Sequence, residues 1–573
     1  MERKFADIHV HPTLKPFNNR KYPNKDGVVQ TLWDKFDERT EDLNKLPRFV
    51  RKKVKVLAKA SQANLDACVV AKLVCPFISL YPVERQWFDV RLKFDPHGRF
   101  IPEMIKLVKR IFLPKKIYPH LGAALSGFPT EFVKKIMQRI EKNEGIDYFN
   151  KELLPQIDYT LDQMKSISKD YKDWSFKIAT DYKEFHDFTN EDKTICSILT
   201  IEGGNSLGNY NSHNIFYKEY KDLNPIEKYY LKRDFINNVT ALKSWKGGRY
   251  TPFFISFCHH FNNLLAGHSR SLAAFGGLLN QEPGLNRGFN KLGKKILKLL
   301  LSRDSGRRIL IDTKHMSIYS RFYYHQLVRE RREKSGDSIP IIQSHAAING
   351  LESFLKALDC DEDKKGFDDN AYFSQWKMNL NDEEILDIYD SDGIIGIVFH
   401  EDKMPGGKVK AQTKELSDRF HKLQEIKIRS AQQQKEYVEI TNGLKPIYMQ
   451  LIWSNIFHII RLIYENRVDD KGNPANGWKI ISIGSDYDGM IDPFDGYFSV
   501  SDLPTLFDEM IDYINTGKGI IHYAENGKSC DFQIQQIDKL MFGKKIEDIL
   551  GDICFKNVDN FLKKYFTDSY LRK

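Results

Sequence analysis

The 573-residue sequence has few cysteines, and they do not form the pattern of a disulfide framework or a zinc ribbon. There are seven, an odd number, widely separated and without a CxxC pair, which is typical of a reducing compartment. No apolar run approaches the length of a membrane span, and the first predicted strand begins too early to leave room for a signal segment. We therefore expect a soluble, cytoplasmic protein with no membrane partner.

The sequence also lacks a long basic tail, a repeat of fixed period and a long low-complexity linker. Its formal net charge of +10 arises from 87 basic and 77 acidic residues, a small excess for such a long chain. These features argue against nucleic acid as a partner and against a string of modules. We expect one elaborated domain over residues 1–573 that acts on a small molecule, with a homo-oligomer as an open alternative.

Short β-rich apolar runs recur along the chain with helical or polar stretches between them. Hydrophobic residues make up 41% and aromatic residues 13% of the sequence, which suits a large core. Eight such runs, several nearly continuous in hydrophobicity, predict a (β/α)8 TIM-type barrel of the metal-dependent hydrolase kind. The runs are 5–11, 65–75, 195–202, 252–259, 308–313, 340–345, 393–400 and 479–486.

Three of the intervals between predicted strands are long and contain several helical patterns. Insertions of this kind emerge from a barrel as loops, and they can form walls or a lid over the site. A polar helix is expected near 411–434, and a helix that covers the sheet is expected at 293–301. The predicted insertions are about 76–190, 350–392 and 401–478.

Imidazole and carboxylate groups stand at or just after the ends of the predicted strands. Because barrel strands converge on one mouth at their carboxyl ends, these groups should lie close together. They are the ligands that zinc and similar divalent ions prefer. A single histidine is more often a satisfied core residue, but jointly the groups favour a metal site. They are His9, His11, Glu202, His259, His315, His345, His400 and Asp486.

Seven segments, taken in order, resemble the membrane (renal-type) dipeptidase family, the M19 metallopeptidases of the amidohydrolase superfamily. The IEGG, DxxHxS and SH segments together are fairly specific, whereas HxH alone indicates only the superfamily. The resemblance spans the barrel but not the long insertions. The segments are ADIHVHP, SILTIEGGNSLG, FFISFCHHFNN, GLNRGFNKLGKKIL, ILIDTKHMS, PIIQSHAAING and ISIGSDYDGM.

This resemblance implies a site for two divalent ions, with zinc as the expected metal. His9 and His11 would hold one ion, and Glu202 would bridge the two. His315 and His345 would hold the second ion. A water held between two such cations ionises near neutral pH.

The resemblance also implies roles in catalysis and a reaction. Asp486 would handle protons, and His259 would reach the substrate carbonyl or the developing oxyanion. The implied function is that of a zinc-dependent amidohydrolase that cleaves a dipeptide or a similar small amide with a metal-activated water.

The sequence departs from the family pattern at two places that bear on the substrate. His11 stands where the family usually has an aspartate, so the first metal site should be more positive. Met378 fills the slot of an arginine that binds the dipeptide carboxylate. Lys377 is the predicted substitute, although it lacks the bidentate fork of arginine. His400 at the mouth is a further predicted substrate-binding residue.

Strand alternation makes predictions about three neighbours of these residues. His260 is expected to face away from the mouth as a structural residue, and Lys314 is expected to turn away from the site. Asp488 is expected either to support the site or to begin the next loop.

Two other functions are left open by the sequence. One is a mononuclear hydrolase or deaminase that uses His9, His11, His315 and Asp486 on a cyclic amide, lactone or amine. The other is a non-catalytic binding protein in which a retained barrel presents its insertions to a partner.

Overall fold

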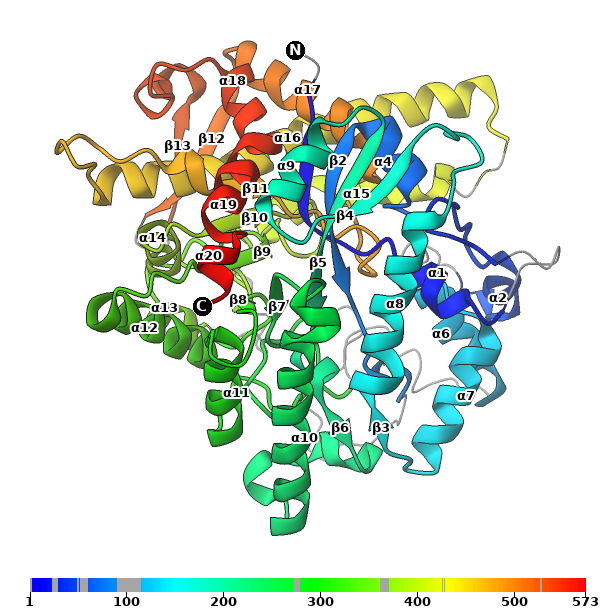
Figure 1. Ribbon diagram of the computed structural model, residues 1–573. Helices are drawn as coiled ribbons and strands as arrows, with labels where there is room; N and C mark the ends of the chain where they lie inside the picture. The colour runs from blue at the N-terminus through cyan, green and yellow to red at the C-terminus, as the bar shows by residue number, and fades with distance from the viewer. Residues whose placement is uncertain are drawn as a thin grey trace.

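A closed parallel barrel surrounded by helices forms the centre of the computed structural model (Figure 1). The structure describes residues 3–22, 29–48, 51, 60–89, 115–272, 279–360, 370–424, 426, 428–525 and 528–573. Within these residues, the strands pair in the order β1-β2-β5-β7-β8-β9-β10-β11, and β11 pairs with β1 to close the ring. The predicted (β/α)8 fold is confirmed.

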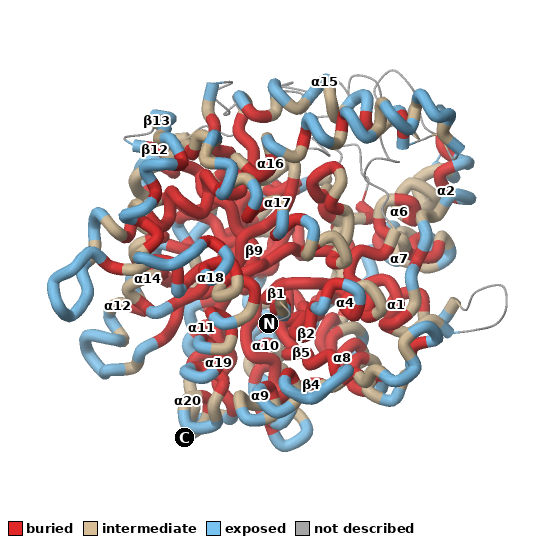
Figure 2. Tube along the Cα trace, turned by 90° about the horizontal axis from the view of Figure 1, so that it is seen from above, coloured by how far each residue is buried: buried red, intermediate tan, exposed pale blue. Residues whose placement is uncertain are grey.

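The barrel strands coincide with the predicted runs at all but one place. They are largely buried because helices cover their outer faces, and buried residues concentrate at the centre of the molecule (Figure 2). Their bounds are β1 (Phe5–Val10), β2 (Leu73–Leu80), β5 (Thr194–Glu202), β7 (Phe254–Ser256), β8 (Leu310–Asp312), β9 (Ile342–Ala346), β10 (Ile394–Ile397) and β11 (Ile481–Ile483).

The prediction of a strand at 65–75 is wrong over most of its length. Residues Leu65–Ala71 form helix α4, which ends at Lys72 in a left-handed conformation with a φ of 58°. Strand β2 begins only at Leu73 and continues to Leu80. A short apolar run cannot be assigned to helix or strand by hydrophobicity alone. The correction moves the carboxyl end of this strand from residue 75 to residue 80.

Helices connect the barrel strands and cover them from outside, as a (β/α)8 fold requires. The predicted helix at 293–301 is present as α11. The connecting helices include α9 (Tyr182–Asn190), α10 (Pro225–Lys243), α11 (Lys291–Leu301), α12 (Ile318–Ser335), α14 (Asp382–Asp390), α17 (Leu503–Asn515) and α19 (Asn557–Tyr565).

The region of the first predicted insertion contains helices and, among its described residues, the two short strands β3 (Ile146–Asp147) and β4. Strand β4 (Ser175–Ile178) pairs in parallel with the first half of β5 and lies outside the closed ring. Parts of two predicted insertions, 90–114 and 361–369, lie outside the described residues. The helices of the first insertion are α6 (Tyr118–Ser126), α7 (Thr130–Glu141) and α8 (Leu154–Asp162).

Two helices replace the single polar helix predicted near 411–434. They are α15 (Gly407–Gln424) and α16 (Ala431–Asn466), which pack against each other in the yellow and orange part of Figure 1. The second half of α16 is buried, and a two-stranded sheet of β12 (Ile520–Glu525) and β13 (Lys528–Gln533) covers it. In the part of the chain that the structure describes, none of the helices combines the length and apolar character of a membrane span.

Candidate metal centre

His9, near the carboxyl end of β1, and His11, the residue after the strand, bring their imidazole rings together. Their Nε2 atoms are 3.1 Å apart, and both side chains are fully buried. The Asp7 carboxylate accepts hydrogen bonds from the backbone N–H groups of His9 (3.0 Å) and Ser485 (3.1 Å). These bonds join the end of β1 to the segment after β11, and they hold His9 and His11 beside the segment that carries Asp486.

Glu202, the last residue of β5, lies among the imidazoles. Its Oε1 is 3.3 Å from His9 Nε2 and 3.5 Å from His315 Nε2. Its Oε2 is 3.2 Å from His11 Nε2. Gly203 follows with a φ of 93°, and a Cβ there would lie 2.3 Å from Asn205 Oδ1, so this position beside the Glu202 carboxylate favours glycine.

His345 follows in β9, and a hydrogen-bond chain fixes the orientation of its ring. Ser344 Oγ donates to Asp312 Oδ2 at 2.7 Å. The same Oγ lies 2.9 Å from His345 Nδ1, so the ring N–H must be the donor and Nε2 keeps its lone pair. That Nε2 lies 3.2 Å from His315 Nε2. Support of this kind is common behind metal-binding histidines, and it gives Asp312 a role that the sequence did not indicate.

Asp486 and His315 adopt a backbone conformation that is unusual for residues with a side chain. Their φ angles are 61° and 64°, which is energetically unfavourable for non-glycine residues. The conformation brings Asp486 Oδ1 to 3.3 Å from His11 Nε2. Asp488, by contrast, accepts hydrogen bonds from Lys15 Nζ (2.6 Å) and the N–H of Ala63 (2.8 Å), so it anchors a loop.

The arrangement fits two divalent ions that share one carboxylate. Possible ligand atoms that lie within 4.8 Å of one another form four groups among the described residues, and two of these groups share Glu202: His9, His11 and Glu202, and Glu202, His315 and His345. A tetrahedral ion with bonds of about 2.0–2.1 Å separates its ligand atoms by about 3.3 Å. Among the described residues, the buried Oε1 of Glu202 has no hydrogen-bond donor. The spacing, the donor types and this unsatisfied oxygen all suit a cation.

The electrostatics of the cluster also favour positive charge. Burial opposes charge on His11, but hydrogen bonds to Asp486 and Glu202 raise its pKa to about 10. Burial disfavours the charged form of Glu202, yet the surrounding histidines hold its pKa well below the usual value. Burial lowers the pKa of His315 and His345 well below the ordinary value. Glu202 is therefore ionised and these two imidazoles are neutral, as metal ligands must be.

Glu84 is a functional candidate that sequence reasoning missed. Its Oε2 accepts from His259 Nδ1 at 2.9 Å and from Tyr81 OH at 3.0 Å. Burial opposes charge on His259, but Glu202 and Glu84 raise its pKa above the ordinary value. His259 Nε2 lies 3.5 Å from Glu202 Oε2. The signal was hidden because the predicted strand ended at residue 75, whereas β2 ends at residue 80, close to Glu84.

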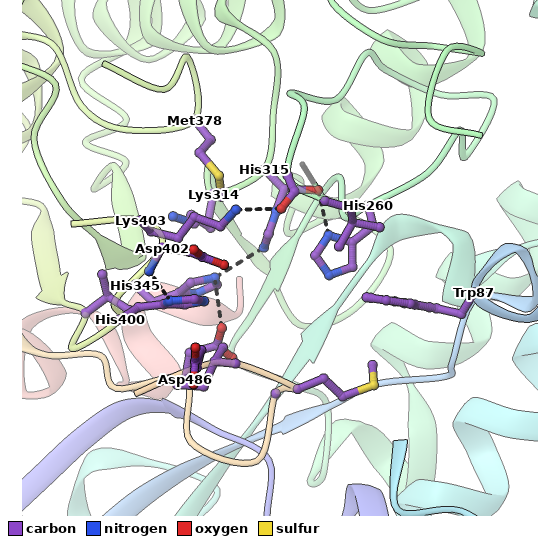
Figure 3. A pocket seen from close by; sticks show the side chains of 17 residues that line it. Trp87, His260, Lys314, His315, His345, Met378, His400, Asp402, Lys403 and Asp486 are labelled. Carbon is purple, nitrogen blue, oxygen red and sulfur yellow. Dashed lines mark hydrogen bonds and ion pairs between the residues drawn. The ribbon is translucent and has the colours of Figure 1, made fainter. Parts of the chain in front are cut away.

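His260 and Lys314 both line the cavity beside the cluster, so the prediction that they turn away is wrong (Figure 3). The reason is the same for both. Strand β7 ends at Ser256 and β8 ends at Asp312, so side-chain alternation no longer applies at these positions. His260 Nδ1 lies 2.7 Å from Ser271 Oγ. Burial lowers the pKa of Lys314 to about 7.

The two predicted substrate-binding residues have different positions. His400 lines the cavity, and its Nδ1 accepts the backbone N–H of Asp402 at 3.0 Å. Burial lowers the pKa of His400 to about 3, so the ring is neutral and its Nε2 carries the proton. Met378 lines the same cavity but Lys377 does not, and the predicted role of Lys377 finds no support in this geometry.

Comparisons with known proteins give no close relative. No protein-family model matches the sequence, and no curated protein matches it. Several solved structures resemble the fold at low identity. One is the probable dipeptidase PvdM from Pseudomonas aeruginosa, with 15% identity, a TM-score of 0.39, and coverage of 88% of this chain and 89% of that chain. Another is a dipeptidase AC described as a metallo peptidase of family M19, with 12% identity, a TM-score of 0.42, and coverage of 99% of both chains. A third is a metallo peptidase from Rhodobacter sphaeroides liganded with a phosphinate mimic of the dipeptide L-Ala-D-Ala, with 11% identity, a TM-score of 0.41, and coverage of 99% of this chain and 100% of that chain. Likeness at this level does not establish the chemistry of this chain, which rests on its own residues.

Proposed function

We propose that the protein is a metal-dependent amidohydrolase of the dipeptidase type, with zinc as the expected metal. His9 and His11 would hold one ion, and Glu202 would bridge it to the second. His315 and His345 would hold the second ion. The substrate is proposed to be a dipeptide or a similar small amide, as the resemblance of the sequence segments to the M19 family suggests.

The observation that carries this proposal is the sharing of Glu202 between two groups of ligand atoms. One carboxylate oxygen lies 3.3 Å from His9 Nε2 and 3.5 Å from His315 Nε2. A histidine and carboxylate cluster built only for core stability would pair each group with a hydrogen-bond donor. Here the Oε1 atom has no such donor among the described residues, which supports a bridging role.

The chain's own side chains can supply the remaining steps of amide hydrolysis. A pair of bound divalent ions lowers the pKa of a water and polarises a carbonyl. Asp486 lies at the edge of the cluster and can accept the proton of the attacking water and deliver it to the leaving amine. His259, held by Glu84, can donate a hydrogen bond to the developing oxyanion. His400 offers a neutral N–H donor at the cavity wall.

The test is a count of metal ions together with an activity panel. We expect about two zinc ions per chain and turnover of at least one dipeptide in a panel with L- and D-residues at the second position. Glu202→Gln should lower the metal count because the bridge weakens.

Other outcomes would support the alternative functions. One ion per chain, together with a Glu202→Gln variant whose metal content equals that of the wild type, would favour a mononuclear hydrolase or deaminase. Full metal loading without turnover of any dipeptide would favour a non-catalytic binding protein.

A further inference from the structure

His260 presents one ring nitrogen to the cavity beside the metal-ligand cluster. Its Nδ1 lies 2.7 Å from Ser271 Oγ, and both residues line the cavity. Its Nε2 has no hydrogen-bond partner among the residues that the structure describes. The ring centre is 5.1 Å from that of Trp87 and 5.1 Å from that of His315, and the ring lies between them in Figure 3. Nε2 is therefore the nitrogen that can contact a molecule in the cavity.

A buried network around Ser271 fixes which nitrogen of His260 carries the proton. Gln281 Nε2 donates to Ser271 Oγ at 2.9 Å and to the His260 carbonyl oxygen at 2.7 Å. Its Oε1 accepts the backbone N–H groups of Ser271 (3.3 Å) and Leu272 (3.0 Å). The described residues offer the Ser271 hydroxyl proton no acceptor other than His260 Nδ1, and a buried donor should be bonded. The ring is therefore neutral, and its Nε2 is a hydrogen-bond donor.

The neighbouring His259 has a carboxylate at each of its ring nitrogens and does not line the cavity. Its Nδ1 lies 2.9 Å from Glu84 Oε2, and its Nε2 lies 3.5 Å from Glu202 Oε2. Glu84 Oε1 also accepts the backbone N–H of Phe261 at 3.2 Å. One carboxylate thus holds the residues on both sides of His260. The ring centres of His259 and His260 are 3.7 Å apart, so the two imidazoles keep a fixed relation.

The spacing of three imidazoles suits one oxygen atom of a bound molecule. A ring nitrogen of each of His259, His260 and His315 lies within 4.8 Å of the other two. An oxygen between three such atoms can lie about 2.8 Å from each, which is the length of an ordinary hydrogen bond. A metal ion at this place would need the lone pair of His260 Nε2, which the Ser271 network protonates. The arrangement therefore favours an oxygen acceptor at His260.

We propose that His260 is a further catalytic residue, which donates a hydrogen bond from Nε2 to the oxygen of the scissile carbonyl. This inference rests on the proposed function and adds a second imidazole donor beside His259. The ring is neutral and held in place before the substrate binds, so it needs no reorganisation. The hydrogen bond would strengthen as negative charge develops on the oxygen, which is how a fixed donor lowers the barrier of acyl transfer.

Two unreactive dipeptide analogues test this hydrogen bond without relying on turnover. One is a phosphinate, whose tetrahedral oxygens resemble the reaction intermediate, and the other is a reduced analogue in which CH2 replaces the carbonyl. In calorimetry on the full-length, zinc-loaded protein, His260→Phe should weaken phosphinate binding about tenfold or more, as expected for a lost hydrogen bond to a charged group. Binding of the reduced analogue should change less than twofold. His260→Gln keeps an N–H donor and should retain most of the phosphinate affinity.

His268→Gln is the matched comparison. The ring nitrogens of His268 lie 3.0 Å and 3.1 Å from the carbonyl oxygens of Ser269 and Pro283, and the ring does not line the cavity. Its replacement should leave the preference for the phosphinate unchanged. His260→Leu serves as a second variant without a donor in case His260→Phe does not fold.

Three outcomes would contradict the inference. An undiminished preference for the phosphinate in His260→Phe would overturn it alone and leave His259 as the donor. A lower zinc count in His260→Phe than in the wild type would overturn it in favour of a metal ligand. Binding of neither analogue by the zinc-loaded wild type would overturn both the inference and the proposed function.

Discussion

At the scale of single residues, the centre depends on a few backbone conformations that side-chain chemistry alone does not predict. His315 and Asp486 have positive φ angles of 64° and 61°, and such conformations are found mostly where structure around them enforces them. For Asp486 the result is a carboxylate 3.3 Å from His11 Nε2, although it follows the end of β11 by three residues. The unfavourable conformation is consistent with a functional position.

Replacement of Asp486 separates proton transfer from metal binding. Asp486→Asn preserves the shape of the side chain but removes its ability to accept a proton. We expect the variant to retain its metal ions and to lose about 10²–10⁴-fold in kcat, the usual range for loss of a general acid or base. Metal analysis and steady-state kinetics on the same preparation measure both quantities. An unchanged rate would remove Asp486 from the mechanism.

At the scale of elements, the region predicted as the third insertion makes two different contributions. The first half of α16 packs mainly on α15, whereas residues from Tyr448 onward enter the core beside α17 and β12. Phe457 is fully buried, with its ring 5.4 Å from those of Trp453 and Trp478. The second half of the helix is therefore part of the barrel's core.

A pair of substitutions checks this division. Phe457→Ala should lower the free energy of unfolding by about 3–5 kcal/mol, because it leaves a cavity in a packed aromatic cluster. Ile428, in the loop before α16, is 91% exposed, and Ile428→Ala should change stability by no more than about 0.5 kcal/mol. Chemical denaturation followed by circular dichroism measures both. Similar losses for the two variants would contradict the assignment of this segment.

At the scale of the whole molecule, metal binding should stabilise the fold in a way that depends on pH. His11 has a folded-state pKa of about 10, so it is protonated at neutral pH and must lose that proton to bind zinc. Protons therefore compete with the metal, and zinc affinity rises with pH up to about 10. For each proton released, zinc affinity rises about tenfold per pH unit. At saturating zinc, this raises the free energy of unfolding by about 1.4 kcal/mol per pH unit.

The expected result is a zinc-induced rise in Tm that is larger at pH 8 than at pH 6. Scanning calorimetry with zinc and with a chelator at each pH measures the difference. His315 and His345 release no proton, since burial already keeps their pKa values low. A zinc effect that is equal at both pH values would show that His11 is not a protonated ligand.

The barrel and the residue types of the centre could be predicted from local patterns in the sequence. Continuous apolar runs predicted parallel strands because strands buried on both faces need such runs. Acidic and imidazole residues at their ends marked the mouth because a barrel brings those ends together. The prediction of a strand at 65–75 is wrong because α4 and β2 are both apolar, and hydrophobicity alone does not distinguish a short helix from a strand.

The residues that surround the candidate ligands could be identified only from the folded structure. Glu84, His260 and Lys314 lie beyond the ends of their strands, where alternation of side chains no longer applies and long-range contacts set each direction. Glu84 supports His259 from the segment that follows β2, 175 residues away in sequence. The positions of these groups depend on how distant segments pack, which local patterns of the sequence do not contain.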